Sequence, residues 1–123
     1  MLSMWTQMMS TKMDSRLKSS RFRRKFRLNL IDKKKYFQCG GAMIKEHAQA
    51  IVKDRLNNKG VDGHQTPYKG HPVFTAQHAT GTCCRKCLFR WHRIPAYRDL
   101  NEGEVQTVVG IIMRWLYREI SRR

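Results

Sequence analysis

The segment from Gly70 to Pro95 constrains this chain most, because it holds three of the four cysteines, three of the five histidines and one of the three tryptophans. Cys83, Cys84 and Cys87 fall within five residues, which is too close for independent disulfide bridges. We therefore expect reduced thiols and a cytoplasmic protein. We consider three roles for this segment: it binds a metal ion, it forms the buried face of a helix, or it carries out a reaction.

Metal binding is the first interpretation, because zinc takes thiolate and imidazole ligands in a tetrahedron. The predicted ligands exceed the four that zinc needs: His78, Cys83, Cys84, Cys87 and His92, with His71 as a substitute for His92. On a helix, Cys87 shares a face with either preceding cysteine, but His92 joins only if the helix ends or bends. A single Cys-x-x-Cys pair is not a zinc-finger pattern.

A second interpretation needs no metal. Free cysteine packs as a small hydrophobe, so Cys84, Cys87, Leu88 and Trp91 would form the buried face of a helix. The neighbouring histidines would then bind backbone groups or surface residues.

A third interpretation is a small enzyme. A thiol at a helix N-terminus with basic neighbours ionises readily, so Cys83 or Cys84 would be the nucleophile, with His78 or His92 as the base. No nucleotide-binding loop, nucleophile elbow or metalloprotease helix is present. The sequence specifies neither a small-molecule substrate nor an oligomeric state.

The chain is strongly basic, with 25 Lys and Arg against 9 Asp and Glu and a net charge of +16. Such a surplus favours a polyanionic partner, and we predict nucleic acid, with an anionic membrane surface as the lesser alternative. The predicted contact residues are Arg21, Arg23, Arg24, Lys25, Arg27, Arg85, Lys86, Arg90 and Arg93. An alternative is a protein interaction module that docks through exposed aromatic side chains.

The periodicity predicts an all-α, small single-domain bundle of four to five helices with one long loop, which a metal would further stabilise. Residues 1–15 are predicted to be a flexible extension, and residues 16–123 the domain. The longest apolar run, Val108 to Met113, is far shorter than the ~20 residues that a transmembrane helix needs. We therefore predict no transmembrane segment.

Several local signals place the helices. Phe22, Phe26 and Leu30 recur at spacing four and predict a helix, Asp32 is a predicted cap for the next one, and Gly40 and Gly41 interrupt the pattern. A longer helix then runs from about Ala42 to Leu56, and a loop from Asn57 to Gly70. Thr82 is the predicted cap of a helix that ends before Pro95. Asn101 and Glu104 begin the last helix, whose apolar face contains Val105, Val108, Val109, Ile112 and Leu116.

The stretch QTPYKGHPVFTAQHATGTCCRKCLFRWHRIP, followed by a helix containing IIMRWL, resembles the bacterial family called domain of unknown function 4186. The resemblance implies a compact bacterial domain and brings no reaction, cofactor or partner. The positions that match the family motif are Gln65, Thr66, Pro67, Gly70, His71, Pro72, His78, Cys83, Cys84, Cys87, Trp91, His92 and Pro95.

Overall fold

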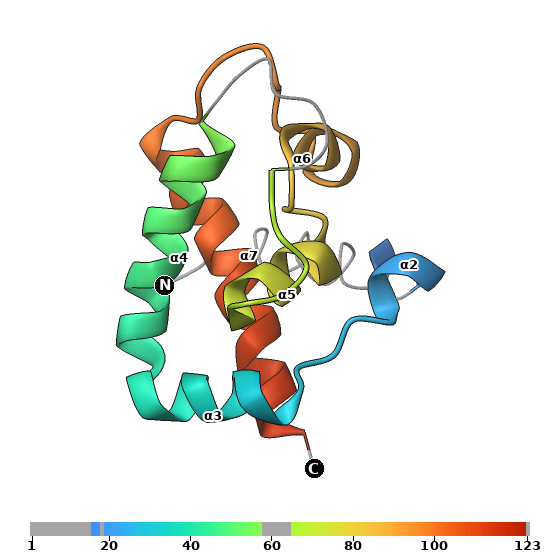
Figure 1. Ribbon diagram of the computed structural model, residues 1–123. Coiled ribbons are helices and arrows are strands. Elements are labelled where there is room, and N and C mark those ends of the chain that lie inside the picture. Colours follow the sequence, from blue (N-terminus) through green and yellow to red (C-terminus); the bar gives the residue numbers. More distant parts are fainter. Residues whose placement is uncertain (1–15, 18, 58–64, 123) are drawn as a thin grey trace, which may run out of the picture.

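Two helices with apolar stripes, α4 (Gly41–Leu56) and α7 (Glu102–Ser121), run antiparallel and pack against each other (Figure 1). In the computed structural model, which describes residues 16–17, 19–57 and 65–122, the other helices are α2 (Arg21–Arg24), α3 (Leu30–Cys39), α5 (Pro72–Thr80) and α6 (Arg85–His92). These residues form six helices and no strand, which confirms the all-helical class. The predicted extension, residues 1–15, lies outside the described residues.

The hydrophobic core lies where α4, α5 and α7 meet. Every residue of the predicted apolar face of α7 is buried, as are Ile44, Ala48, Val52 and Leu56 of α4. Burying apolar surface contributes roughly 25 cal/mol for each Å², so the burial of these side chains stabilises the bundle. Among the described residues, no helix combines the length and apolar character that a membrane crossing requires.

The helix ends follow local side-chain chemistry. The capping box at the start of α7 is confirmed, since Asn101 Oδ1 accepts from Glu104 N and a Glu104 carboxylate oxygen accepts from Asn101 N. Gly40, with φ of 83°, separates α3 from α4, as the sequence predicted.

Two expectations for the N-terminal half are wrong. The cap of α3 is Asn29, whose Oδ1 accepts from Asp32 N at 2.8 Å, so Asp32 lies inside the helix. Phe22, Phe26 and Leu30 do not share a helix, because α2 ends at Arg24 and α3 begins six residues later.

Helix α5 was not predicted, and it lies at the centre of the molecule in contact with α2, α3, α4 and α7 (Figure 1). His71 is its N-cap, Pro72 its first residue, and Gly81, with φ of 71°, its left-handed C-cap. The N-cap of α6 is Cys84, not Thr82. The segment between residues 71 and 92 therefore forms two helices, and this explains the higher helix count.

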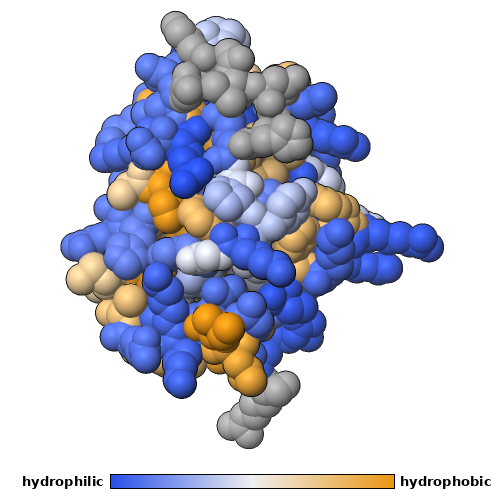
Figure 2. Space-filling view, in the orientation of Figure 1, coloured by the Kyte–Doolittle hydropathy of each residue, from blue (hydrophilic) through white to orange (hydrophobic). Residues whose placement is uncertain are grey.

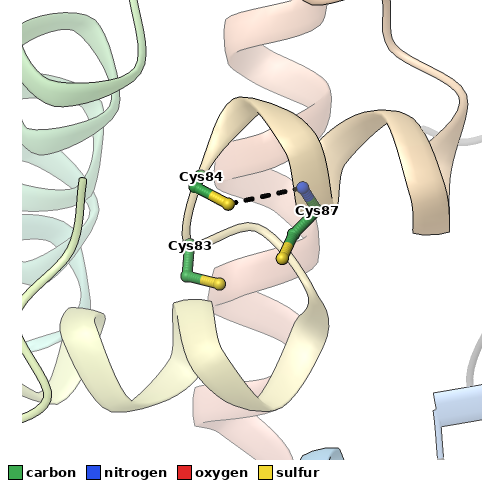
Figure 3. A group of neighbouring side chains, drawn as sticks. All are labelled: Cys83, Cys84 and Cys87. Atoms are coloured by element: carbon green, nitrogen blue, oxygen red, sulfur yellow. Dashed lines mark hydrogen bonds between the residues drawn. The ribbon is translucent and has the colours of Figure 1, made fainter. Parts of the chain in front are cut away.

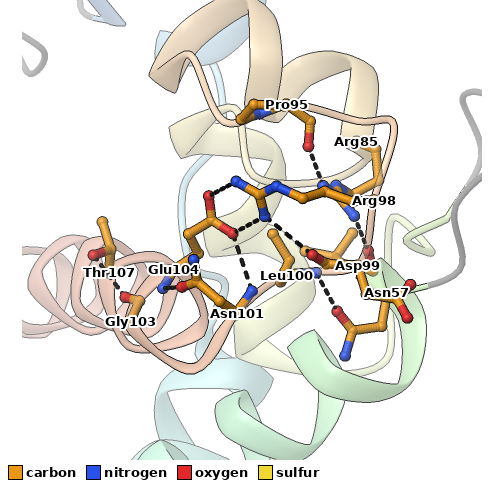
Figure 4. Close-up of polar contacts among 11 residues, drawn as sticks. Asn57, Arg85, Pro95, Arg98, Asp99, Leu100, Asn101, Gly103, Glu104 and Thr107 are labelled. Atoms are coloured by element: carbon orange, nitrogen blue, oxygen red, sulfur yellow. Dashed lines mark hydrogen bonds and ion pairs between the residues drawn. The ribbon is translucent and has the colours of Figure 1, made fainter.

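A buried arginine joins three parts of the chain. Arg85 is only 2% exposed, and its guanidinium donates to the carbonyl oxygens of Leu56, at the end of α4, and Pro95, beyond α6 (Figure 4). Beside it, Arg98 binds Glu104 through two N–O contacts of 2.6 and 2.9 Å, and this lowers the pKa of Glu104 to about 2.

Replacing Arg85 with alanine should lower the free energy of unfolding by about 3 kcal/mol, because it leaves two buried carbonyl groups without donors. The neighbouring Lys86 is exposed, so Lys86→Ala should change stability by less than about 0.5 kcal/mol. Urea unfolding of the two variants measures both changes in the free energy of unfolding. Equal stability of both variants would show that Arg85 does not hold these segments together.

Candidate metal centre

Three cysteine side chains meet at the turn between α5 and α6. The Sγ atoms of Cys83, Cys84 and Cys87 all lie within 4.8 Å of one another, and their side chains point toward a common space (Figure 3). Cys83 and Cys84 are buried, Cys87 is half-buried, and none forms a disulfide. The predicted reduced thiols therefore agree with the structure.

The local backbone explains this convergence. Cys84 is extended (φ −157°, ψ 167°) and caps α6, so that its Sγ accepts from Cys87 N at 3.4 Å. The extended residue turns the chain into the helix, and the thiols before and after it come to the same side. The same cap satisfies one of the N–H groups that a helix N-terminus leaves unpaired.

Arg23, from α2, is the fourth member of the cluster. Its Nη1 donates to Cys83 Sγ at 3.5 Å and to the backbone oxygen of His78 at 2.6 Å, and its Nη2 donates to Cys87 Sγ at 3.1 Å. The side chain is buried, so its charge acts on the sulfur atoms with little screening by water.

The three thiols differ in their acidity. Hydrogen bonds from Cys83 and Cys84, with the charge of Arg23, lower the pKa of Cys87 to about 2. Hydrogen bonding with the other two cysteines raises the pKa of Cys83. The most acidic thiol is thus Cys87, whereas the enzyme interpretation assigned the nucleophile to Cys83 or Cys84.

The two predicted histidine ligands bind backbone groups instead of thiols. His78 Nε2 donates to the oxygens of Thr66 (3.2 Å) and Pro67 (3.1 Å), and His92 Nε2 donates to the oxygen of Thr80 (2.7 Å). Burial lowers the pKa of both rings, so both are neutral near pH 7. His78 Nδ1 is buried and has no hydrogen-bond partner.

Several family-motif positions support the cysteine turn. Gln65 accepts from Arg85 N at 2.8 Å and donates to the oxygen of Arg55 at 2.7 Å. Thr66 Oγ1 donates to the backbone oxygen of Cys83 at 2.6 Å. These bonds fix the turn to the segment that precedes α5.

Trp91 packs directly on Gly81, the glycine that ends α5. A Cβ atom at Gly81 would lie 2.7 Å from Cδ1 and Cγ of the indole. The guanidinium carbons of Arg16 and Arg23 lie 5.4 and 5.8 Å from the ring centre. The indole therefore packs against both the α5–α6 turn and the arginine of the cluster.

At the other end of α5, His71 is a helix cap. Its Nδ1 accepts from Val73 N at 3.0 Å, so its Nε2 carries the proton and donates to His47 Nδ1, also at 3.0 Å. Burial lowers the pKa of His71 to about 4, with the charges of Lys35 and His47 adding to the effect. His71 is thus committed to the helix start and is not available to complete a metal shell at the cysteines.

The predicted nucleic-acid contacts separate into two groups. Two residues of the set, Arg23 and Arg85, are buried, and their guanidinium groups are engaged inside the protein. The other members are exposed: Arg21, Arg24, Lys25, Arg27, Lys86, Arg90 and Arg93. Figure 2 shows a face on which hydrophilic side chains predominate, with small hydrophobic patches between them.

These features define a small all-helical protein with a three-cysteine cluster that can hold a metal ion. The chain belongs to the family described as Domain of unknown function (DUF4186), whose profile matches residues 11–117. The match spans the cysteine and histidine segment and most of α7, so it confirms the resemblance found in the sequence. No solved structure matches the chain.

Proposed function

We propose that Cys83, Cys84 and Cys87 bind one zinc ion that fixes the α5–α6 turn. The approach of three free Sγ atoms to within 4.8 Å carries the proposal. Tetrahedral zinc with Zn–S distances of about 2.3 Å separates its sulfur ligands by roughly 3.8 Å, which fits this arrangement. Thiolates select zinc over hard cations such as Mg²⁺ and Ca²⁺.

His78 is our candidate for the fourth ligand. Its Nδ1 is buried without a partner, while its Nε2 donates to two backbone oxygens. Histidines that bind metals usually donate their other ring N–H in this way, which fixes the tautomer and the ring orientation. In the proposed site, His78 Nδ1 is the fourth ligand of a Cys₃His shell.

Cobalt substitution tests the ligand set, because Co²⁺ occupies zinc sites and its thiolate charge-transfer absorption grows with the number of bound sulfur atoms. The wild-type protein should give the spectrum of a tetrahedral three-thiolate site. Cys83→Ser, Cys84→Ser and Cys87→Ser should each weaken the thiolate band, and His78→Ala should change the visible d–d bands only. Cys39 lies outside the cluster, in α3, so Cys39→Ser should leave the spectrum unchanged. A spectrum of hydrated Co²⁺ in the wild-type protein would refute the proposal.

Arg23 should support the metal without binding it. Loss of N–H donors to ligand atoms typically costs 10- to 100-fold in metal affinity, so we expect a decrease of this size for Arg23→Ala. Arg24→Ala is the matched control, because Arg24 is exposed in the same short helix and should bind zinc as the wild type does. Competition with a chromophoric chelator measures both affinities. Unchanged affinity of Arg23→Ala would remove Arg23 from the site.

The second candidate function is nucleic-acid binding. It is favoured by the exposure of seven of the nine predicted basic contacts, on a chain of net charge +16. Affinity for an oligonucleotide should fall steeply between 50 and 200 mM salt, because phosphate contacts release counterions. Fluorescence anisotropy measures this slope. The absence of binding at the lower salt concentration would exclude this function.

A further inference from the structure

A cleft separates the N-terminal arm, here Leu17 and residues 19–27, from the C-terminal part of α7. Its volume is about 770 Å³, and the end of α5 forms part of its wall. This volume lies within the range of ligand-binding pockets, roughly 300–1,000 Å³. The cleft has no role in the proposed metal site, although Arg23 belongs to both.

We propose that this cleft binds a single-stranded nucleic acid, an inference that rests on the nucleic-acid-binding function proposed above. Apart from the buried Arg23, five arginines and one glutamate line the cleft, a surplus of four positive charges: Arg24, Arg27, Arg114, Arg118, Arg122 and Glu119. The guanidinium group is the side chain best suited to binding phosphate with paired hydrogen bonds.

Glu119, the one acidic residue that lines the cleft, has a structural role. Glu119 is 5% exposed, and its Oε1 accepts from Arg27 Nε at 2.7 Å and from Leu28 N at 3.3 Å. These bonds tie the N-terminal arm to α7 and hold the two walls of the cleft together. The glutamate therefore shapes the site and does not present a bare carboxylate to an anion.

The arginines of α7 form a row. Arg114 and Arg118 are four residues apart and share one face of the helix, and Arg122 is the extended C-cap residue just beyond its end. Such a row matches the repeated charge of a nucleic-acid backbone better than it matches a single phosphate ion.

Aromatic side chains in the cleft favour the binding of bases as well as phosphates. Phe26, Trp115 and Tyr117 line the same cleft, and Tyr117 is 66% exposed. Single-strand binding sites combine a basic groove with aromatic rings on which unpaired bases stack. Duplex readers insert a protruding helix or ribbon into a DNA groove, so a concave cleft favours a single strand.

The test compares two double variants by anisotropy with a fluorescein-labelled 12-nucleotide oligothymidylate at low salt. Tyr117→Ala with Arg122→Ala removes one exposed ring and one arginine from the cleft. Tyr97→Ala with Lys45→Ala removes an exposed ring and an exposed basic side chain that belong neither to the cleft nor to the predicted nucleic-acid contacts. We expect at least a tenfold loss of affinity for the cleft variant and less than a twofold loss for the control. Thermal melting verifies that both variants fold.

Each of the other possible results would contradict the cleft proposal or one part of it. Wild-type binding that both variants weaken equally would overturn the cleft and leave general nucleic-acid binding in place, whereas no wild-type binding would end both proposals. Equal affinity for a duplex of the same length, or equal competition by inorganic polyphosphate, would overturn the base-stacking argument. Preferential binding to vesicles containing phosphatidylserine would assign the cleft to membranes instead.

Discussion

Removing the proposed zinc ion with a chelator is expected to lower the free energy of unfolding by at least about 4 kcal/mol, and the melting temperature by roughly 15 °C. Metal binding to a site that forms only in the folded chain is folding free energy, and structural zinc sites contribute strongly to it. In this protein the metal would replace weak contacts among three clustered thiols with metal–ligand bonds. Thermal unfolding followed by circular dichroism, with and without the chelator, measures the difference.

Two cysteine variants serve as controls for this experiment. Cys87→Ser should melt near the chelated wild-type protein and should not respond to the chelator. Cys39→Ser should retain the full response, because Cys39 is half-buried in α3 and lies outside the cluster. If the wild-type protein melts identically in both conditions, the cysteines do not hold a stabilising metal.

Replacing Gly81 with alanine should cost about 3 kcal/mol or more of folding stability. Its φ of 71° is unfavourable for a residue with a side chain, and the added Cβ would lie 2.7 Å from the Trp91 ring. Trp91 would have to leave its place against the turn, and core strain of this kind typically costs 1–3 kcal/mol on its own. Urea unfolding of the variant measures the loss.

Gly110 provides a matched control for this substitution. It is exposed within α7, and a Cβ atom there would have no neighbour within 4 Å. Gly110→Ala should therefore stabilise the protein by about 0.5–1 kcal/mol, the usual penalty of glycine inside a helix. A Gly81→Ala variant as stable as the wild type would show that the turn has room for a side chain.

The sequence predicted the helices that bury one face. The stripe of α7 and the end of α4 at Leu56 are confirmed, because a half-buried helix shows its apolar residues at regular spacing. Helix α5 carries no such stripe, since polar residues such as Gln77 and His78 are buried along with the apolar ones. The signals that identify it are Pro72 at its first position and Gly81 just beyond its end.

The cysteine cluster was predictable from spacing, whereas its partners were not. Cys83, Cys84 and Cys87 lie in one turn, but Arg23 is 60 residues from Cys83 and reaches it only through tertiary packing. Tertiary packing also determines the position of Arg85. The sequence predicted this residue as a nucleic-acid contact, but its side chain is buried in the fold. The row formed by Arg114, Arg118 and Arg122 was detectable, because its spacing of four residues is visible in the sequence.

The most direct test of the central claim is the zinc content of the untagged, reduced protein, determined by elemental analysis beside Cys87→Ser. We expect close to one zinc ion per wild-type chain and strong depletion in the variant. Wild-type protein without zinc, which also fails to take it up when refolded in its presence, would contradict the account.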